Sequence, residues 1–251
     1  MISKNNLKYI KSLQLKKMRK EENRFLIEGT KSVLEILKAD FNIHQILASA
    51  DFIEGNRDLL QQKNVEFLEC STQELSQTGS FEHNNTAIAV AEMKPNTLLI
   101  PEPNEYLLVL DNISDPGNLG TIIRIADWYG IQKIIVSKTT AEVYNPKVIA
   151  ASMGSFTRTN IYYTDLIPYL ESHKTYVYGA RLEGKSIYET TFQSTGGMIL
   201  MGNESHGISP DLYSWVDEFV FIPRFGHAES LNVGVATAIF CDHVRRGMGE
   251  R

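Results

Sequence analysis

The chain has 251 residues, of which 43% are hydrophobic and 22% charged, and its formal net charge is −5. This composition is that of an ordinary globular protein, and the length suits one large domain or two modest ones. No stretch approaches the ~20 consecutive apolar residues of a membrane span, and the N-terminus lacks the apolar run of a signal peptide. Two cysteines and six scattered histidines predict neither a disulfide framework nor a metal site. We therefore expect a cytoplasmic protein with no membrane anchor and no metal.

The charge is distributed unevenly along the chain. Residues 1–20 hold seven basic side chains and no acidic one. A basic segment on an acidic protein can bind phosphates locally, although the same pattern also fits one solvated face of a helix. The candidate phosphate contacts in this segment are Lys11, Lys16, Lys17, Arg19 and Lys20.

Residues 1–97 alternate between strand and helix patterns, which predicts a small α/β domain. Strands are expected at 25–29, 43–49, 65–70 and 86–93, and a helix at 56–63. Thr30 is expected to cap a second helix, and Ser71 with Glu74 forms a capping-box pattern for a third. The prolines between 94 and 104 predict a linker, which we place at 98–105.

Residues 106–251 form a second alternating segment. Apolar runs predict strands at 106–111, 133–137, 160–164, 175–180, 198–202 and 218–223. Such near-continuous apolar runs are typical of parallel strands buried on both faces. Asn145 with Pro146 and Ser209 with Pro210 indicate helix starts, and a last helix is expected over 231–246. We predict a parallel α/β sheet with helices on both faces.

Three loops that follow predicted strands are rich in glycine and small polar residues: 111–120, 202–209 and 222–234. Parallel sheets bind ligands at the carboxyl ends of their strands, where such loops expose backbone groups. Neither the dinucleotide pattern G-x-G-x-x-G nor the P-loop pattern fits the first loop. The residues alone predict an α/β protein with a small-molecule site and a basic arm.

The same loops carry three ordered motifs. They are N-x-G-x-x-x-R-x-A at 118–126, G-N-E-x-x-G at 202–207 and I-P-x-x-G-x-x-E-S-L-N-V at 222–233. Together they resemble the SpoU family, which are RNA ribose 2′-O-methyltransferases of the SPOUT superfamily. The first domain, above all residues 5–29, resembles the RNA substrate-binding domain often fused to these enzymes. The resemblance implies S-adenosyl-L-methionine (SAM) as cofactor, a homodimer, and a parallel sheet whose C-terminal part forms a deep trefoil knot.

The resemblance also implies roles for individual residues. The expected cofactor contacts are Gly202, Asn203, Gly207, Ile222, Pro223, Gly226 and Leu231. The expected catalytic residues are Asn118, Arg124, Glu204, Ser230 and Asn232.

Simpler structural roles remain open for several of these residues. Arg124 can remove the ribose proton, hold the adjacent phosphate, or merely pair with Asp127 or Glu204. Asn118, Ser230 and Asn232 can each be no more than a helix cap.

Large-subunit (23S) ribosomal RNA is the expected substrate, favoured over tRNA because the first domain resembles those of rRNA-modifying members. A tRNA ribose methyltransferase and a non-catalytic RNA-binding protein are the alternatives. Base methylation is disfavoured by the motifs that contain Arg124 and Asn232, and a nucleotide-dependent oxidoreductase by the missing dinucleotide pattern.

Overall fold

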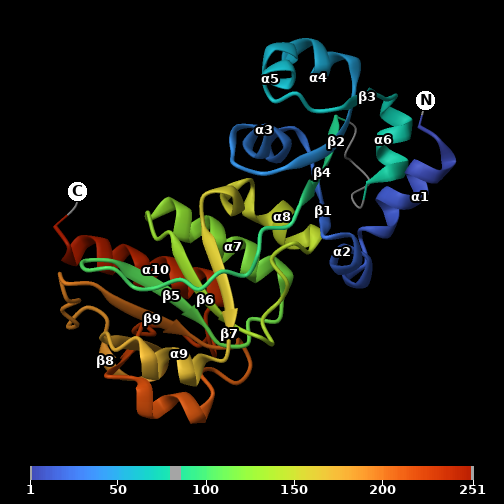
Figure 1. The fold of residues 1–251 in the computed structure, drawn as a ribbon. Coiled ribbons are helices and arrows are strands. Elements are labelled where there is room, and N and C mark those ends of the chain that lie inside the picture. Colours follow the sequence, from blue (N-terminus) through green and yellow to red (C-terminus); the bar gives the residue numbers. More distant parts are fainter. Residues whose placement is uncertain (1, 80–85, 250–251) are drawn as a thin grey trace. The chain divides into compact units, whose positions relative to one another are not determined.

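The computed structural model describes residues 2–79 and 86–249, which form two compact units (Figure 1). One unit combines Met1–Pro95 with Val143–Thr157, and the other combines Asn96–Glu142 with Arg158–Arg251. The chain therefore leaves the first unit within the proline-bearing stretch 94–104 and returns to it once. Within the described ranges, no helix has the length and apolar character needed to cross a membrane.

The first unit has a mixed sheet with strand order β1-β4-β2-β3. Strand β4 runs antiparallel to β1 and β2, whereas β2 and β3 are parallel. The strands are β1 (Arg24–Glu28), β2 (Ile43–Ala48), β3 (Phe67–Glu69) and β4 (Ala87–Glu92). The helices are α1 (Lys4–Ser12), α2 (Lys16–Glu22), α3 (Thr30–Lys38), α4 (Ala50–Gly55), α5 (Arg57–Gln62), α6 (Thr72–Thr78) and α8 (Pro146–Ser152), with the 3₁₀ turn η1 (Ser155–Thr157). The predicted small α/β domain is confirmed.

Local capping in this unit follows the sequence in α6 and departs from it in α3. The capping box of Ser71 and Glu74 is present at the start of α6. Thr30 does not cap α3, because the cap position is Gly29 with φ 90° and no side-chain bond. The helix predicted at 56–63 is confirmed as α5, which begins directly after Asn56. The sequence analysis did not predict α4, which ends at the same asparagine.

Residues 143–157 join the first unit through aromatic packing. The Phe25 ring lies 4.4 Å from the Tyr144 ring and 6.0 Å from the Phe156 ring, measured between centroids. Asn145 caps α8 and Pro146 occupies its first turn, as the sequence predicts. The sequence does not indicate this partition, since the aromatic partners are distant along the chain.

The second unit is built on a six-stranded sheet with order β10-β8-β9-β5-β6-β7, in which all neighbouring strands are parallel. The strands are β5 (Tyr106–Leu110), β6 (Lys133–Ser137), β7 (Asn160–Thr164), β8 (Val177–Ser186), β9 (Gly197–Met201) and β10 (Glu218–Phe221). Every residue of the central strands β5 and β9 is buried, as their apolar runs predict. The predicted parallel sheet is confirmed.

The helices of this unit are α7 (Pro116–Trp128), α9 (Leu166–Ser172) and α10 (Val233–Gly247). Helices α7 and α10 lie side by side (Figure 1), and a Cβ placed on Gly234 would sit 3.0 Å from the Thr121 side chain. The helix predicted after Ser209 is the short 3₁₀ helix η2 (Pro210–Trp215).

Strand β8 departs from regular pairing beside the loops that follow the strands. Gly179 pairs with Phe219 of β10, but the next pair is Lys185 with Val220, so residues 180–184 bulge out of the sheet. Gly184 has φ 141°, and a Cβ there would lie 2.2 Å from the Phe219 carbonyl oxygen. Glycine is therefore required where the bulge returns to the strand.

Candidate active site

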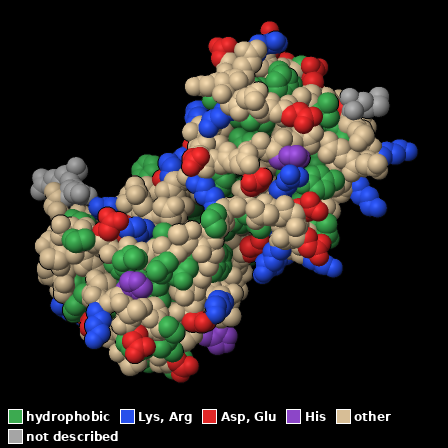
Figure 2. Space-filling view, in the orientation of Figure 1, with side chains coloured by type: hydrophobic (Ala, Val, Ile, Leu, Met, Phe, Trp, Pro, Cys, Tyr) green, Lys and Arg blue, Asp and Glu red, His purple; other side chains and the backbone are tan. Residues whose placement is uncertain are grey.

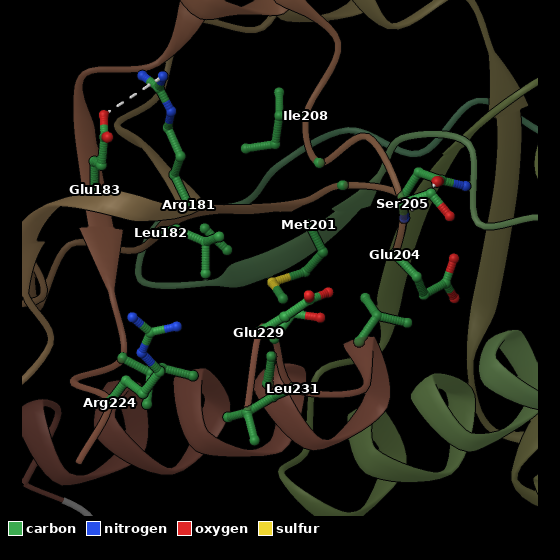
Figure 3. A pocket seen from close by; sticks show the side chains of 18 of the residues that line it. Arg181, Leu182, Glu183, Met201, Glu204, Ser205, Ile208, Arg224, Glu229 and Leu231 are labelled. Carbon is green, nitrogen blue, oxygen red and sulfur yellow. Dashed lines mark hydrogen bonds and ion pairs between the residues drawn. The ribbon is translucent and has the colours of Figure 1, made fainter. Parts of the chain in front are cut away.

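A single cavity of about 640 Å³ in the second unit gathers most of the predicted site residues. It is lined by β9, the loop 202–208, the loop 222–231, the β8 bulge and the buried face of α10. In Figure 3, Met201, Glu229 and Leu231 converge on this space. All predicted cofactor contacts line it: Gly202, Asn203, Gly207, Ile222, Pro223, Gly226 and Leu231.

The loop 202–208 is a tight backbone turn that is hydrogen-bonded to the segment directly after β5. Asn203 and Gly207 exchange both backbone hydrogen bonds, at 2.9 and 2.8 Å, and Gly207 has φ 68°. A Cβ on Gly202 would lie 2.2 Å from the backbone of Gly207, so the chain can double back here only with glycine. The Asn203 side chain donates to the Asn112 carbonyl at 2.8 Å and accepts the Ser205 N–H at 2.8 Å. The amide of Asn203 thus shapes the loop.

A buried carboxylate fixes the far end of the same loop. Asp111, only 6% exposed, accepts the Ser209 N–H at 2.8 Å. Buried charge is costly unless it is hydrogen-bonded, so this contact and the Asn203–Asn112 bond hold the loop at two points. The position of Glu204 between them is thereby set.

Three predicted catalytic residues form a hydrogen-bonded relay. Asn232 caps α10, because its Oδ1 accepts the Gly234 and Val235 N–H groups. Its Nδ2 must then donate, and it reaches Asn118 Oδ1 at 2.8 Å. Asn118 Nδ2 in turn donates to Glu204 Oε1 at 2.5 Å. The relay joins the three motif loops, each of which follows a different strand.

Asn118 lies inside the first turn of α7 and does not cap it. The cap is Asp115, whose side chain accepts the Asn118 N–H at 2.8 Å. The interpretation of Asn118 as a mere helix cap is therefore wrong, whereas that of Asn232 as a cap is correct but incomplete. Ser230 lines the cavity on the exposed loop before α10, outside the cap position.

Arg124 points away from the apolar core of its helix. It is exposed, while its neighbours Ile122 and Ile123 are fully buried. Both acids considered as partners are engaged elsewhere: Asp127 with Arg158 at 2.8 Å, and Glu204 with Asn118. Within residues 2–79 and 86–249, the Arg124 guanidinium makes no hydrogen bond or ion pair. It is therefore available to a ligand.

The basic arm is only partly available to a phosphate. Lys11, Lys16, Lys17 and Lys20 are exposed on α1 and α2. Basic side chains project on this side of the first unit, interspersed with acidic ones (Figure 2). The prediction that Arg19 contacts a phosphate is wrong. Arg19 is 1% exposed and donates to the carbonyls of Leu13 and Gln14 at 3.0 and 2.8 Å. Its guanidinium closes the turn between α1 and α2 and does not face a ligand.

The β8 bulge is the part of the site that the sequence analysis missed. Arg181, Leu182 and Glu183 line one wall of the cavity. Arg181 lies over the rings of Tyr213 and Phe219, at 5.0 and 5.4 Å from their centroids, and pairs with Glu183 at 3.8 Å (Figure 3). No motif marks these residues, and only the glycines at 179 and 184 hint at an irregular strand.

No group of three or more His, Cys, Asp or Glu side chains that could hold a metal ion occurs in the part of the chain that the structure describes. Cys70 and Cys241 are both free and buried.

Comparisons with known proteins place the chain in a family. Residues 105–242 match the SpoU rRNA Methylase family, and residues 4–89 match the MRM3-like substrate binding domain. The chain is 32% identical over 238 residues to the 23S rRNA (guanosine(2553)-2'-O)-methyltransferase RlmP of Bacillus subtilis, covering 94% of each. It is 29% identical over 248 residues to the 23S rRNA (uridine(2479)-2'-O)-methyltransferase of Streptomyces viridochromogenes, covering 90% of this chain and 84% of that protein.

Solved structures give the same result. The AdoMet-bound rRNA methyltransferase from Sinorhizobium meliloti superposes with a TM-score of 0.88 at 28% identity, covering 98% of this chain and 97% of that one. The fold and the motif loops thus define a SAM-dependent RNA methyltransferase. The chain belongs to the SpoU rRNA methylase family.

Proposed function

We propose that the protein methylates the 2′-oxygen of one ribose in large-subunit ribosomal RNA. The relay Glu204–Asn118–Asn232 carries this proposal, because it brings the three motif loops together beside the cavity. The relatives named above act on 23S rRNA, one at a guanosine and one at a uridine. The proposal therefore does not specify which base the target nucleotide carries. The ribose 2′-oxygen is the feature that both substrates share.

The cavity fits SAM by the chemistry of its lining. Gly202, Ile222 and Leu231 all line it, and the absence of a side chain at Gly202 lets the loop fold back tightly at the cavity wall. Glu183, Glu204 and Glu229 supply carboxylates around a ligand that carries a positive sulfonium and an ammonium. SAM, when bound, supplies an activated methyl group, so the protein must mainly position and deprotonate the acceptor.

Each of the remaining predicted catalytic residues then has a distinct task. Asn118 and Asn232 hold their amides in fixed orientations beside the cavity and position the ribose hydroxyl. Arg124 holds the phosphate next to that ribose, since a guanidinium fork suits phosphate and arginine keeps its proton in proteins. Ser230, on the loop that lines the cavity, provides a further hydroxyl near the reacting groups.

Two exposed apolar side chains support a homodimer. Trp128 on α7 is 83% exposed and Val235 on α10 is 50% exposed, and these helices pack against each other. We propose that a second copy of the chain packs against helices α7 and α10 and covers these two side chains. Sedimentation of the purified protein should give a dimer, and Trp128→Glu should give a monomer. A monomeric wild-type protein at micromolar concentration would contradict the proposal.

Two further features stay predictions. Insertion of β9 between β5 and β8, which precede it in the chain, is compatible with the trefoil knot of the family. The free buried thiols of Cys70 and Cys241 are compatible with a reducing, cytoplasmic location.

The activity is tested by mapping ribose methyl groups in total RNA from cells with and without the gene. Loss of one 2′-O-methyl mark from 23S rRNA, restored by the purified protein with SAM, is the expected result. Loss of a tRNA mark instead would move the substrate to tRNA. No lost ribose mark in either RNA would contradict catalysis and favour a non-catalytic RNA-binding protein.

A further inference from the structure

The mouth of the cavity carries large apolar side chains that are exposed to solvent. Phe225 is 90% exposed, Leu182 is 73% exposed and Leu231 is 47% exposed, and all three line the cavity. Leaving such side chains in water forgoes the free energy that their burial would supply. An apolar rim around a binding site is a frequent mark of ligand contact.

Phe225 stands out because the loop around it is held at two points. The Arg224 side chain donates to the Ala228 carbonyl at 3.2 Å, which bridges the loop behind Phe225. The end of the same loop is fixed by the bond from Asn232 to Asn118. Phe225 itself has no ring partner among the residues described in the two units. A restrained backbone thus presents an uncovered aromatic ring.

The distribution of charge indicates what can approach this ring. Glu183 is offset by Arg181, with which it pairs at 3.8 Å on the same cavity wall. Glu204 and Glu229 remain as negative charges in the lining and repel a phosphate from the interior. Arg224 is exposed directly beside Phe225, and within the described ranges it makes no ion pair. In Figure 3, Arg224 and Glu204 lie on opposite sides of the cavity. An anionic ligand is therefore favoured on the Arg224 side of the mouth.

A flat ring with a guanidinium next to it fits an unpaired nucleobase and its phosphate. Bases in single-stranded RNA stack on exposed Phe, Tyr or Trp rings, and arginine contacts the neighbouring backbone. A second copy of the chain fits less well, because Phe225 is flanked by Arg224, Gly226 and His227 and belongs to no continuous apolar helix face.

We propose that Phe225, aided by Arg224, is a stacking platform for a base adjacent to the methylated ribose in the RNA substrate. This inference rests on the proposed rRNA methyltransferase activity. It adds a residue that keeps a base next to the target nucleotide stacked on the protein. The platform requires that the target nucleotide be unpaired or splayed out when it reaches the cavity.

The test compares Phe225→Ala, Phe225→Leu and Phe225→Trp as full-length proteins. The substrate is 23S rRNA from cells that lack the gene, with tritiated SAM as methyl donor. We expect kcat/KM for RNA to fall about tenfold in Phe225→Ala and Phe225→Leu, the loss expected for one base–aromatic stack. Phe225→Trp should retain near wild-type activity, and its fluorescence should be quenched by RNA relative to the wild-type protein. SAM affinity, measured by calorimetry without RNA, should be unchanged in all three.

Three outcomes would contradict the proposal that Phe225 is a stacking platform and would leave the proposed methyltransferase activity unaffected. Weaker SAM binding in Phe225→Ala would place the ring against the cofactor. A shift from dimer to monomer in sedimentation would place it against a second copy. Equal activity of Phe225→Leu and wild type would show that a flat ring is not needed. Failure of the wild-type protein to methylate the RNA would instead contradict the proposed function itself.

Discussion

Asn232 Nδ2 lies 2.8 Å from Asn118 Oδ1, although 114 positions separate the two residues in the chain. The direction of this bond is fixed, since Asn232 Oδ1 is occupied by the backbone N–H groups that begin α10. Asn118 must therefore present its amide N–H₂ to Glu204. A helix cap, a motif asparagine and a loop carboxylate thus act as one unit, and removing either of the two bonds should disturb the other.

Asn118→Asp should break the relay. The substitution replaces the donor facing Glu204 with a carboxylate, so two like charges oppose each other. We expect kcat to fall roughly 100-fold, as for the loss of one pre-organised donor. SAM affinity should change little because Asn118 does not line the cavity. Single-turnover methyl transfer and calorimetry with SAM measure the two effects.

A double variant makes that prediction sharper. Adding Glu204→Gln to Asn118→Asp restores a donor and an acceptor in swapped positions, so part of the lost activity should return. Asn160→Asp, on the exposed start of β7, is the matched control and should be active. If the double variant is less active than both single variants, the relay does not act as a pair.

Arg124→Ala should strongly reduce turnover without affecting folding. The guanidinium is exposed and makes no bond within the described residues, so the free energy of unfolding should stay within about 0.5 kcal/mol of the wild-type value. Loss of a phosphate clamp should reduce kcat/KM for RNA by about 100-fold or more. Arg124→Lys keeps the charge without the fork and should retain intermediate activity. Near-normal turnover of Arg124→Ala would contradict the role of Arg124 in holding the phosphate. Arg57→Ala on α5, which also removes an exposed arginine, serves as the control.

Arg19→Met should weaken the fold of the first unit. The buried guanidinium satisfies the carbonyls of Leu13 and Gln14, and its loss leaves them without those donors. We expect a loss of about 2–3 kcal/mol in the free energy of unfolding, the usual cost of unsatisfied buried polar groups. Urea denaturation followed by circular dichroism measures it. Unchanged stability together with weaker RNA binding would return Arg19 to the set of RNA contacts.

The exposed lysines of the basic arm, in contrast to the buried Arg19, should affect RNA binding. Replacing Lys16, Lys17 and Lys20 together by Gln removes three charges that are exposed to solvent. RNA affinity should fall, and the slope of log K against log salt should decrease by about 0.7–0.9 for each lost phosphate contact. Filter binding over a range of salt concentrations measures the slope. An identical slope in the triple variant would mean that the arm is only a solvated face.

The sequence predicted those features that rest on local chemistry. Apolar runs located the buried strands β5 and β9, the pair Ser71 and Glu74 gave the capping box, and ordered motifs located the loops around the cavity. What it could not predict depends on contacts between distant residues. The burial of Arg19 is set by a turn that brings two carbonyls to it, and the β8 bulge by a register jump opposite Phe219.

The buried thiols should make stability depend on alkaline pH. Burial raises the pKa of Cys70 to about 11 and that of Cys241 to about 12, whereas an unfolded thiol ionises near pH 8.5. Above pH ~8.5 the unfolded state therefore loses protons that the native state keeps, and each thiol lowers stability by up to ~1.4 kcal/mol per pH unit. Denaturation between pH 7.5 and pH 9.5 should show this decline, before buried tyrosines contribute. Cys241→Ala should be less stable at pH 7.5, but its free energy of unfolding should decline less steeply with pH than that of the wild type. An equally steep decline in the variant would show that the Cys241 thiol does not cause the pH dependence.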